Sequence, residues 1–167
     1  MRHTRPVLGK GYCYGSTDIA LAQSFEKDAE RAIARLPIVE RIVSSPLTRA
    51  HMLAERIASQ RNLALVVEPR VTEFDFGAWE GRLWSEIPRH ELDAWAADFL
   101  DARPHGGESV RGFRSRCLAA LRDYAEHPGD TLVVCHAGVV RAAFARGADS
   151  RDFATPIGYG ECMRWPE

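Results

Sequence analysis

The stretch that decides the fold is Thr131-Leu132-Val133-Val134-Cys135-His136-Ala137-Gly138. Its first five residues form the most strand-like run in the chain, apolar on both faces as a central parallel strand would be. His136 follows where this strand ends, and residues 139–146 have the composition of a helix. Strand, histidine, small residue, glycine and helix, in that order, place an imidazole and free helix amides at one point.

A second histidine stands near the start of the chain, in Met1-Arg2-His3-Thr4. Arg2 puts a cation beside a side chain that can attack an anion. Because neighbouring side chains of a strand point to opposite faces, Arg2 and His3 converge on one ligand only where a strand has just ended. That places the pair at the carboxyl edge of a sheet, where open α/β folds bind ligands. The glycine-rich loop over residues 5–18 is long enough to fold over a ligand on His3.

Helix and strand patterns alternate along the rest of the chain. Helical spacing of apolar residues predicts helices over residues 20–36, 46–60 and 110–127, and mixed helical sequence over 84–100. Asp18 is the expected cap of the first of these helices. Short apolar runs predict strands over residues 38–44 and 64–68. With no internal repeat, linker or low-complexity segment, the pattern predicts one α/β domain over residues 1–167.

Composition excludes several classes of function. The 22 Lys and Arg residues balance 23 Asp and Glu residues, so no basic excess points to nucleic acid. We find no apolar run of transmembrane length and no signal peptide, and we expect a cytoplasmic protein without a membrane partner. The four cysteines lack CxxC spacing and are expected to be buried thiols. A zinc site built from Cys13, Cys135 and a histidine is not expected, nor is any cofactor.

Two further segments carry candidate ligand-binding side chains. In Ser45-Pro46-Leu47-Thr48-Arg49-Ala50, Arg49 lies in the first turn of a helix that starts at a strand end, where free amides and the helix dipole favour an anion. The alternative is an exposed arginine that forms a salt bridge to Glu55 or to an acidic loop. Glu73 lies in an aromatic-rich loop, residues 71–81, whose apolar surroundings would raise its pKa and make it a proton donor near neutral pH. The alternative is that Glu73 and Asp75 are solvated loop acids.

Five motifs, in this order, resemble the histidine phosphatase superfamily and its phosphoglycerate mutase-like fold. They are Arg2-His3, residues 45–50, Glu73 with residues 75–81, residues 106–109, and His136-Ala137-Gly138. Within the superfamily, His3-Thr4 and the loop over residues 11–18 are most similar to the alpha-ribazole phosphatase branch of cobalamin biosynthesis. The resemblance implies a three-layer α/β/α sandwich with a mostly parallel central sheet.

The resemblance also implies a set of catalytic roles. His3 would be the nucleophile that takes the phosphoryl group as a phosphohistidine, and Glu73 would protonate the departing alkoxide and then help water attack the phosphoenzyme. The phosphate oxygens would be held by Arg2, Arg49, His136 and Ala137. Since positioning and cations supply most of the catalysis of phosphoryl transfer, two guanidinium groups and an imidazole can replace a metal.

The expected activity is therefore metal-independent hydrolysis of a small phosphorylated metabolite, and the resemblance points to alpha-ribazole 5'-phosphate. Two alternatives stay open: a non-catalytic protein that binds phosphate ligands, and a phosphoglycerate mutase-type phosphotransferase. The first is motivated by a short strand before Arg2 and by Gly9, which stands where the family has an asparagine. The expected assembly is a monomer or a homodimer.

The strand before Arg2 is expected to be truncated, because only Met1 precedes the motif. Residues 38–44 and 131–135 would then face a gap between them, lined by unpaired backbone groups. Each unsatisfied buried polar group costs about 1–3 kcal/mol. The expectation is that the natural protein begins several residues upstream, with an apolar strand.

Overall fold

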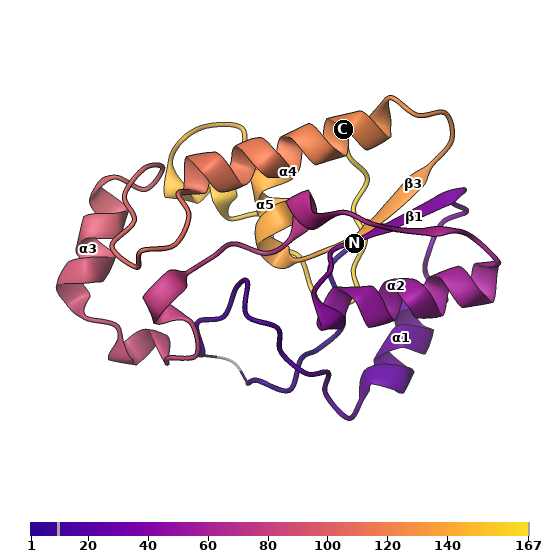
Figure 1. Cartoon of the computed structure of the whole chain (residues 1–167), viewed down its shortest axis with the longest axis horizontal. Helices are drawn as coiled ribbons and strands as arrows, with labels where there is room; N and C mark the ends of the chain where they lie inside the picture. The colour runs from indigo at the N-terminus through magenta and orange to yellow at the C-terminus, as the bar shows by residue number, and fades with distance from the viewer. Residues whose placement is uncertain (10, 167) are drawn as a thin grey trace.

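The computed structural model describes residues 1–9 and 11–166. Its strands are β1 (Arg41–Ser44), β2 (Leu65–Val67) and β3 (Thr131–Val134). Its helices are α1 (Phe25–Ile33), α2 (Thr48–Arg61), α3 (Arg89–Ala97), α4 (Val110–Ala125) and α5 (Ala137–Phe144). The strands form a parallel sheet in the order β2-β1-β3, which confirms the α/β fold with a parallel sheet (Figure 1).

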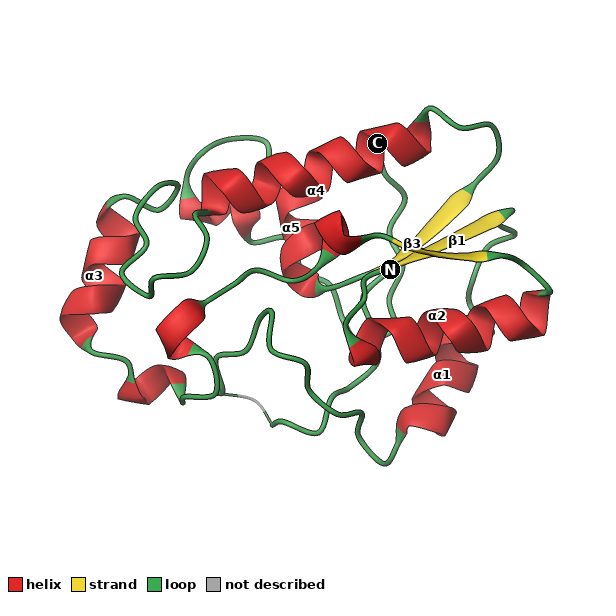
Figure 2. Ribbon diagram, in the orientation of Figure 1, coloured by secondary structure: helices red, strands yellow, loops and turns green. Residues whose placement is uncertain are grey.

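The sheet lies between two pairs of helices, α1 with α2 and α4 with α5, as Figure 2 shows. The side chains of β3 alternate between the two cores. Leu132 and Val134 pack with α1 and α2, and Val133 packs with α4 and α5. This alternation is what a strand buried on both faces requires. The helix α3 lies apart from the sheet, beyond the loops that follow β2.

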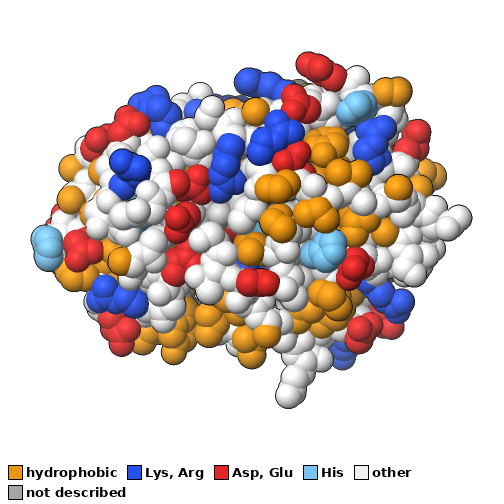
Figure 3. Space-filling view, viewed as in Figure 1, with side chains coloured by type: hydrophobic (Ala, Val, Ile, Leu, Met, Phe, Trp, Pro, Cys, Tyr) orange, Lys and Arg blue, Asp and Glu red, His pale blue; other side chains and the backbone are white. Residues whose placement is uncertain are grey.

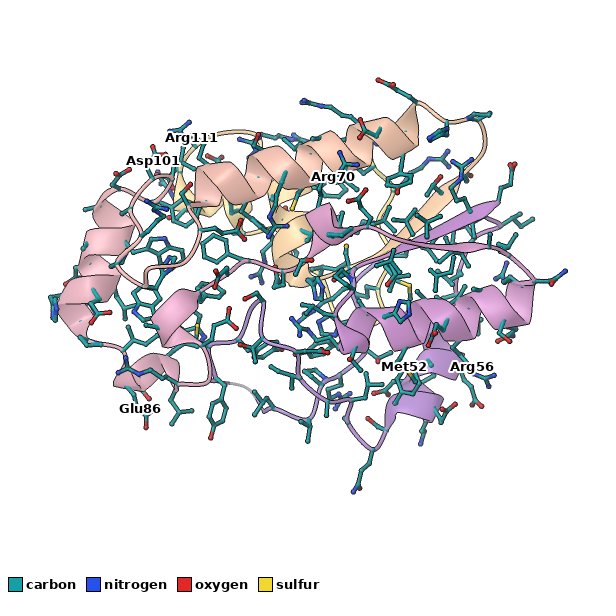
Figure 4. The ribbon with its side chains drawn as sticks, in the orientation of Figure 1. Met52, Arg56, Arg70, Glu86, Asp101 and Arg111 are labelled. Atoms are coloured by element: carbon teal, nitrogen blue, oxygen red, sulfur yellow. The ribbon has the colours of Figure 1, made fainter. Side chains whose placement is uncertain are left out.

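Helix α4 shows how the local sequence sets an element's bounds. The Ser109 side chain accepts a hydrogen bond from the Gly112 amide at 3.1 Å and so caps the helix. Its buried residues recur every three to four positions and are Val110, Phe113, Cys117 and Ala120. Near this end, Arg111 binds both carboxylate oxygens of Asp101 at 2.7 Å, and the two labelled side chains point toward one another in Figure 4.

The predicted helix over residues 20–36 is wrong at its start. Helix α1 begins at Phe25, and Leu21 instead forms an antiparallel bridge with Pro6. Asp18 caps α2 rather than α1, since its carboxylate accepts from the Thr48 amide at 2.9 Å and from the Thr48 hydroxyl at 2.5 Å. A tertiary contact with the loop therefore overrides helical periodicity in residues 20–24.

Strand β3 has a neighbour on each side, as predicted for a central parallel strand: β1 pairs with one side, and residues 1–2 hydrogen-bond to the other. Among the three named strands, β1 lies between β2 and β3. The strand predicted over residues 38–44 starts only at Arg41, and the side chain of Ile38 is 85% exposed. The apolar run in β3 reflects the burial of both of its faces by helices.

Residues 1–3 lie beside β3, on the side that does not pair with β1. The Met1 ammonium group donates to the Val133 carbonyl at 2.7 Å, the Cys135 amide donates to the Met1 carbonyl at 2.8 Å, and Arg2 bridges Cys135 in parallel. The predicted gap between residues 38–44 and 131–135 is therefore wrong, because these strands pair directly with each other. A cavity of about 650 Å³ lies along the outer side of β3, next to Met1, Val133 and Trp165.

The surface shows no concentration of one charge on the face in Figure 3, where acidic and basic side chains are interspersed. This distribution agrees with the formal net charge of -1. Over the described residues, the helices lack the combination of length and apolar character that crossing a membrane requires.

Candidate active site

The two predicted histidines lie side by side. His3 follows the bridge between Arg2 and Cys135, and His136 follows β3, so the ends of two parallel segments bring their rings together. The ring centroids are 5.2 Å apart, and both side chains are buried. Arg49 is fully buried in the first turn of α2, which follows the carboxyl end of the neighbouring strand β1. The structure thus brings together at one edge of the sheet the groups that the sequence places at three strand ends.

His3 has one ring nitrogen committed to the backbone. Its Nδ1 lies 2.5 Å from the Thr4 carbonyl oxygen, which can only accept, so Nδ1 carries the proton. Nε2 therefore keeps its lone pair, the form in which an imidazole can attack an electrophile. Burial, followed by the charge of Arg49, lowers the pKa of His3 to about 3, so the ring is neutral at physiological pH.

His136 has the opposite ring nitrogen committed. Its Nε2 lies 2.8 Å from the Ser45 hydroxyl, and its Nδ1 is buried with no hydrogen-bond partner among the described residues. Burial, then the neighbouring His3 and Arg49, holds the pKa of His136 well below its usual range. Ser45 was quoted from the sequence only as part of the motif over residues 45–50, and no pattern in the sequence signals its contact with His136.

Arg49 faces the loop over residues 15–17 rather than Glu55, so the predicted alternative of a pair with Glu55 is wrong. One terminal nitrogen donates to the Thr17 carbonyl at 2.8 Å, and the other donates to the Gly15 carbonyl. Its Nε is buried and has no partner among the described residues. A guanidinium has five N–H groups, so Arg49 keeps donors for an anion while the loop holds it in place.

Arg2 is held in a similar way. A terminal nitrogen donates to the Ile157 carbonyl at 2.8 Å, the guanidinium stacks 3.7 Å from the ring centroid of Tyr159, and Nε is buried and unpartnered among the described residues. Buried polar atoms normally have partners, so unpartnered nitrogens on Arg2, Arg49 and His136 mark a site for a ligand with several acceptors. A phosphate dianion has this chemistry.

Glu73 reaches the start of α5. Its carboxylate accepts from the Gly138 amide and from the Phe74 amide, both at 3.0 Å. A Cβ atom at position 138 would lie 2.1 Å from Glu73 Oε1, so only glycine allows this approach. Burial raises the pKa of Glu73, against the opposing effect of these amides and of Arg49, which suits a proton donor. The Gly138 amide therefore donates its hydrogen bond to Glu73, which corrects the expectation that the helix amides are free. Ala137 is the first residue of α5, directly after His136.

Glu80 has a role that the sequence did not reveal, although it lies within one of the quoted motifs. Its carboxylate accepts from the amides of Ser16, Thr17 and Phe76 at 2.9, 2.6 and 3.0 Å. Although burial opposes ionisation, hydrogen bonds from Thr17, Phe76 and Ser16 lower the pKa of Glu80. A charged Glu80 thereby holds the loop whose carbonyl groups bind Arg49.

Two further acids of the quoted motifs, Asp75 and Glu108, are structural neighbours of the site. Asp75 accepts from the Gly77 amide at 2.8 Å, and Glu108 accepts from the Asp75 amide at 3.0 Å while pairing with Arg116 at 2.6 Å. These bonds fix the loop that carries Glu73. Over the described residues, no three His, Cys, Asp or Glu side chains are grouped so that they could hold a metal ion.

A comparison with protein families finds one that matches residues 1–155, described as the histidine phosphatase superfamily, branch 1. The chain belongs to this superfamily. The predicted resemblance is confirmed, and the matched range includes every histidine phosphatase motif quoted from the sequence.

Two curated relatives show the breadth of the superfamily. The adenosylcobalamin/alpha-ribazole phosphatase of Escherichia coli (strain K12) is 32% identical over 111 residues, which are 63% of this chain and 54% of the relative. Phosphoserine phosphatase 1 of Hydrogenobacter thermophilus is 32% identical over 108 residues, which are 62% of this chain and 51% of the relative. The chain thus spans about half the length of the curated relatives it matches.

Solved structures of this superfamily share the fold. The crystal structure of the alpha-ribazole phosphatase from Shigella flexneri superposes with a TM-score of 0.80 at 24% identity, over 96% of this chain and 85% of that one. This likeness confirms the phosphoglycerate mutase-like architecture of three layers.

Proposed function

We propose that the protein hydrolyses a small phosphomonoester through a phosphohistidine on His3. The observation that carries this proposal is the hydrogen bond from His3 Nδ1 to the Thr4 carbonyl. It leaves the Nε2 lone pair available in a buried site where the charges of Arg49 and Arg2 both act on the ring. Such a site offers a neutral nucleophile beside cations that can seat a dianion.

The proposed reaction has two steps. In the first, Arg2 and Arg49 hold the phosphate oxygens, His3 Nε2 forms a bond to phosphorus, and the ester P–O bond breaks as Glu73 protonates the leaving alkoxide. In the second, the Glu73 carboxylate takes a proton from water while the water oxygen attacks phosphorus. The N–P bond breaks, inorganic phosphate leaves, and His3 and protonated Glu73 are restored.

The proposal includes independence from metal ions. Charge develops on the equatorial oxygens during phosphoryl transfer, and the proposal assigns the stabilisation of that charge to the side chains of Arg2, Arg49 and His136. Turnover of an aryl phosphate should therefore be unchanged in excess EDTA. Loss of activity in EDTA that a divalent ion restores would contradict this part of the proposal.

The central experiment is to trap the intermediate. The protein is mixed with a phosphate ester, quenched in alkali, in which phosphohistidine is stable, and analysed by mass spectrometry for a phosphoryl group on His3. Release of phosphate with that adduct supports the proposal. Binding of phosphate esters without an adduct or phosphate release would identify a binding protein instead.

The proposed substrate is alpha-ribazole 5'-phosphate, because relatives in both comparisons are alpha-ribazole phosphatases. A phosphoserine phosphatase is a relative of equal identity, 32%, so phosphoserine is the sharpest competitor. The test ranks kcat/KM over a panel of ribazole, nucleotide and sugar phosphates, phosphoserine and 3-phosphoglycerate. The assignment of alpha-ribazole 5'-phosphate is overturned if it ranks no better than the sugar phosphates.

A further inference from the structure

Two tyrosines from opposite ends of the chain meet over the candidate active site. The hydroxyl groups of Tyr14 and Tyr159 are 3.0 Å apart, a hydrogen bond that joins positions 145 residues apart. The ring centroid of Tyr159 lies 3.7 Å from the Arg2 guanidinium carbon and 5.7 Å from the ring centroid of His3. That of Tyr14 lies 5.6 Å from the Arg49 guanidinium carbon. The rings therefore lie against the groups proposed to seat phosphate and to attack it.

Tyr159 belongs to a part of the chain that the family match does not reach, since the match ends at residue 155. The segment is nevertheless anchored to the site by its backbone. The Gly160 amide donates to the carbonyls of Arg2 and His3 at 3.2 and 3.1 Å, and the Arg2 amide donates to the Glu161 carbonyl at 3.0 Å. The backbone is thus fixed beneath Tyr159, while the residue itself is 37% exposed.

The backbone below Tyr14 is fixed as well. Glu80 holds the amides of Ser16 and Thr17, and a Cβ atom at Gly15 would lie 1.8 Å from the Phe74 carbonyl oxygen, which shows how closely this loop packs. With both backbones anchored, the two phenol rings are the parts of the cover that can move by side-chain rotation alone.

The groups beneath the rings are closed off from solvent. His3 is 2% exposed and Arg49 is fully buried. A phosphate ester cannot reach His3 until part of this cover moves. Opening the tyrosine pair breaks one hydrogen bond between neutral hydroxyls and separates each ring from an arginine that the phosphate then binds.

We propose that Tyr14 and Tyr159 form a gate that selects phosphate esters by the size of the leaving group. A small group can lie beneath the closed pair, whereas a large group must pass between the rings and keep their hydroxyls apart. Binding of an ester with a large leaving group is therefore weakened by the free energy of one hydrogen bond, the one between the two tyrosine hydroxyls. This inference rests on one part of the proposed function, namely that the phosphate group binds beside His3.

The test measures binding without turnover, so that it does not depend on catalysis. Methylphosphonate and naphthylmethylphosphonate share a dianionic head with no ester bond to break, and their affinities are measured by calorimetry. The variants are Tyr14→Phe, Tyr159→Phe and the double variant, each of which keeps the rings and removes the bond. Tyr124→Phe is the matched control, since it removes a hydroxyl that donates to Glu68 at 3.4 Å, outside the candidate active site.

The gate predicts that each single variant binds the naphthyl ligand about two- to tenfold more tightly, the range expected for one net hydrogen bond. Methylphosphonate affinity should stay unchanged, and the double variant should match either single variant because all three lack the same bond. Equal changes for both ligands, effects that add in the double variant, or weaker naphthyl binding would overturn the gate. Intact discrimination in a protein that releases no phosphate from any ester would instead contradict the proposed function and leave the gate standing.

Discussion

The two histidines of the candidate active site occupy equivalent positions in the sequence and different ones in chemistry. Each follows the end of a parallel segment, each is buried, and each has a lowered pKa. His3 donates a hydrogen bond from its Nδ1–H group to the Thr4 carbonyl oxygen, which can only accept. His136 instead turns Nε2 to the Ser45 hydroxyl, which can donate or accept. The tautomer of His3 is therefore determined, while that of His136 is free to change.

This difference assigns the roles in the proposed reaction. A nucleophile needs a lone pair that is always available, and the carbonyl partner of His3 provides it. A group that holds a phosphate oxygen must offer a proton, and the hydroxyl partner of His136 permits it to carry one at either nitrogen. The following experiments compare the effects of changing each histidine and the residues that contact it.

The largest expected effect is that of His3→Ala. Without the nucleophile, both phosphate release and the phosphohistidine adduct should vanish. His90→Ala, which changes an exposed histidine of α3, should retain both. If His3→Ala still forms the adduct and His136→Ala does not, the nucleophile is His136 and the proposed roles of the two histidines are exchanged.

Glu73→Gln should have the next largest effect. Glu73 accepts a hydrogen bond from the amide of Gly138, two residues after His136, and in the proposed reaction it supplies the proton to the leaving group. General acid catalysis contributes about 10²–10⁴-fold, so alkyl phosphate turnover should fall by that factor. Nitrophenyl phosphate, whose leaving group needs little protonation, should lose much less. Equal losses on the two esters would mean that Glu73 only shapes the pocket.

His136→Ala should slow turnover without preventing the adduct. Removing one group that stabilises developing charge typically costs about 10²–10³-fold in kcat. Phosphohistidine should still be detected on His3 after long incubation. Ser45→Ala should give a smaller loss, since it removes only the partner of His136 Nε2. A Ser45→Ala variant as slow as His136→Ala would show that the hydroxyl determines the orientation of the ring.

The smallest expected effect concerns stability against pH. Unfolded His3 titrates near its ordinary pKa of 6.5, and folded His3 titrates at about 3. The unfolded state therefore binds more protons between these values, and stability is lost as pH falls from 6.5 toward 3. At pH 5 the loss from His3 is about 2 kcal/mol, at 1.36 kcal/mol for each pH unit.

The measurement is urea unfolding at pH 7 and pH 5 for the wild type and for His3→Gln, with His90→Gln as the control. His3→Gln should lose less stability on acidification than the other two proteins. The raised pKa of Glu73 affects stability in the opposite direction: the stability that comes from keeping Glu73 protonated is lost as pH rises above 4.5. This effect is common to all three proteins. An equal loss in His3→Gln would show that His3 is not held neutral by the fold.

Much of the site could be predicted from local pattern alone. A histidine after an apolar run marks a strand end, and Arg49 after Ser45-Pro46 marks the first turn of a helix. These inferences hold because the apolar pattern of a strand or helix, and the residues that begin or end it, lie close together in sequence. The sequence order of five such motifs was sufficient to predict the superfamily, which the family match confirms.

Local pattern failed where a distant contact decided the outcome. Asp18 was predicted to cap the helix that follows it, but it caps α2, 30 residues away, because the loop before α1 folds back as an extended segment. The place of the N-terminal segment was also mispredicted. It was expected between residues 38–44 and 131–135, but these two strands pair with each other, and residues 1–2 lie on the other side of β3.

The sequence by itself determined which residue types stand at the strand ends, and hence the proposal of a phosphate site with two histidines and two arginines. Only the tertiary structure decided which histidine nitrogen is free, that Glu80 holds the loop facing Arg49, and that Tyr14 meets Tyr159. The physical reason is that each of these contacts joins groups far apart along the chain, 145 residues in the tyrosine pair. Such contacts depend on how the layers pack, and no local period or spacing encodes them.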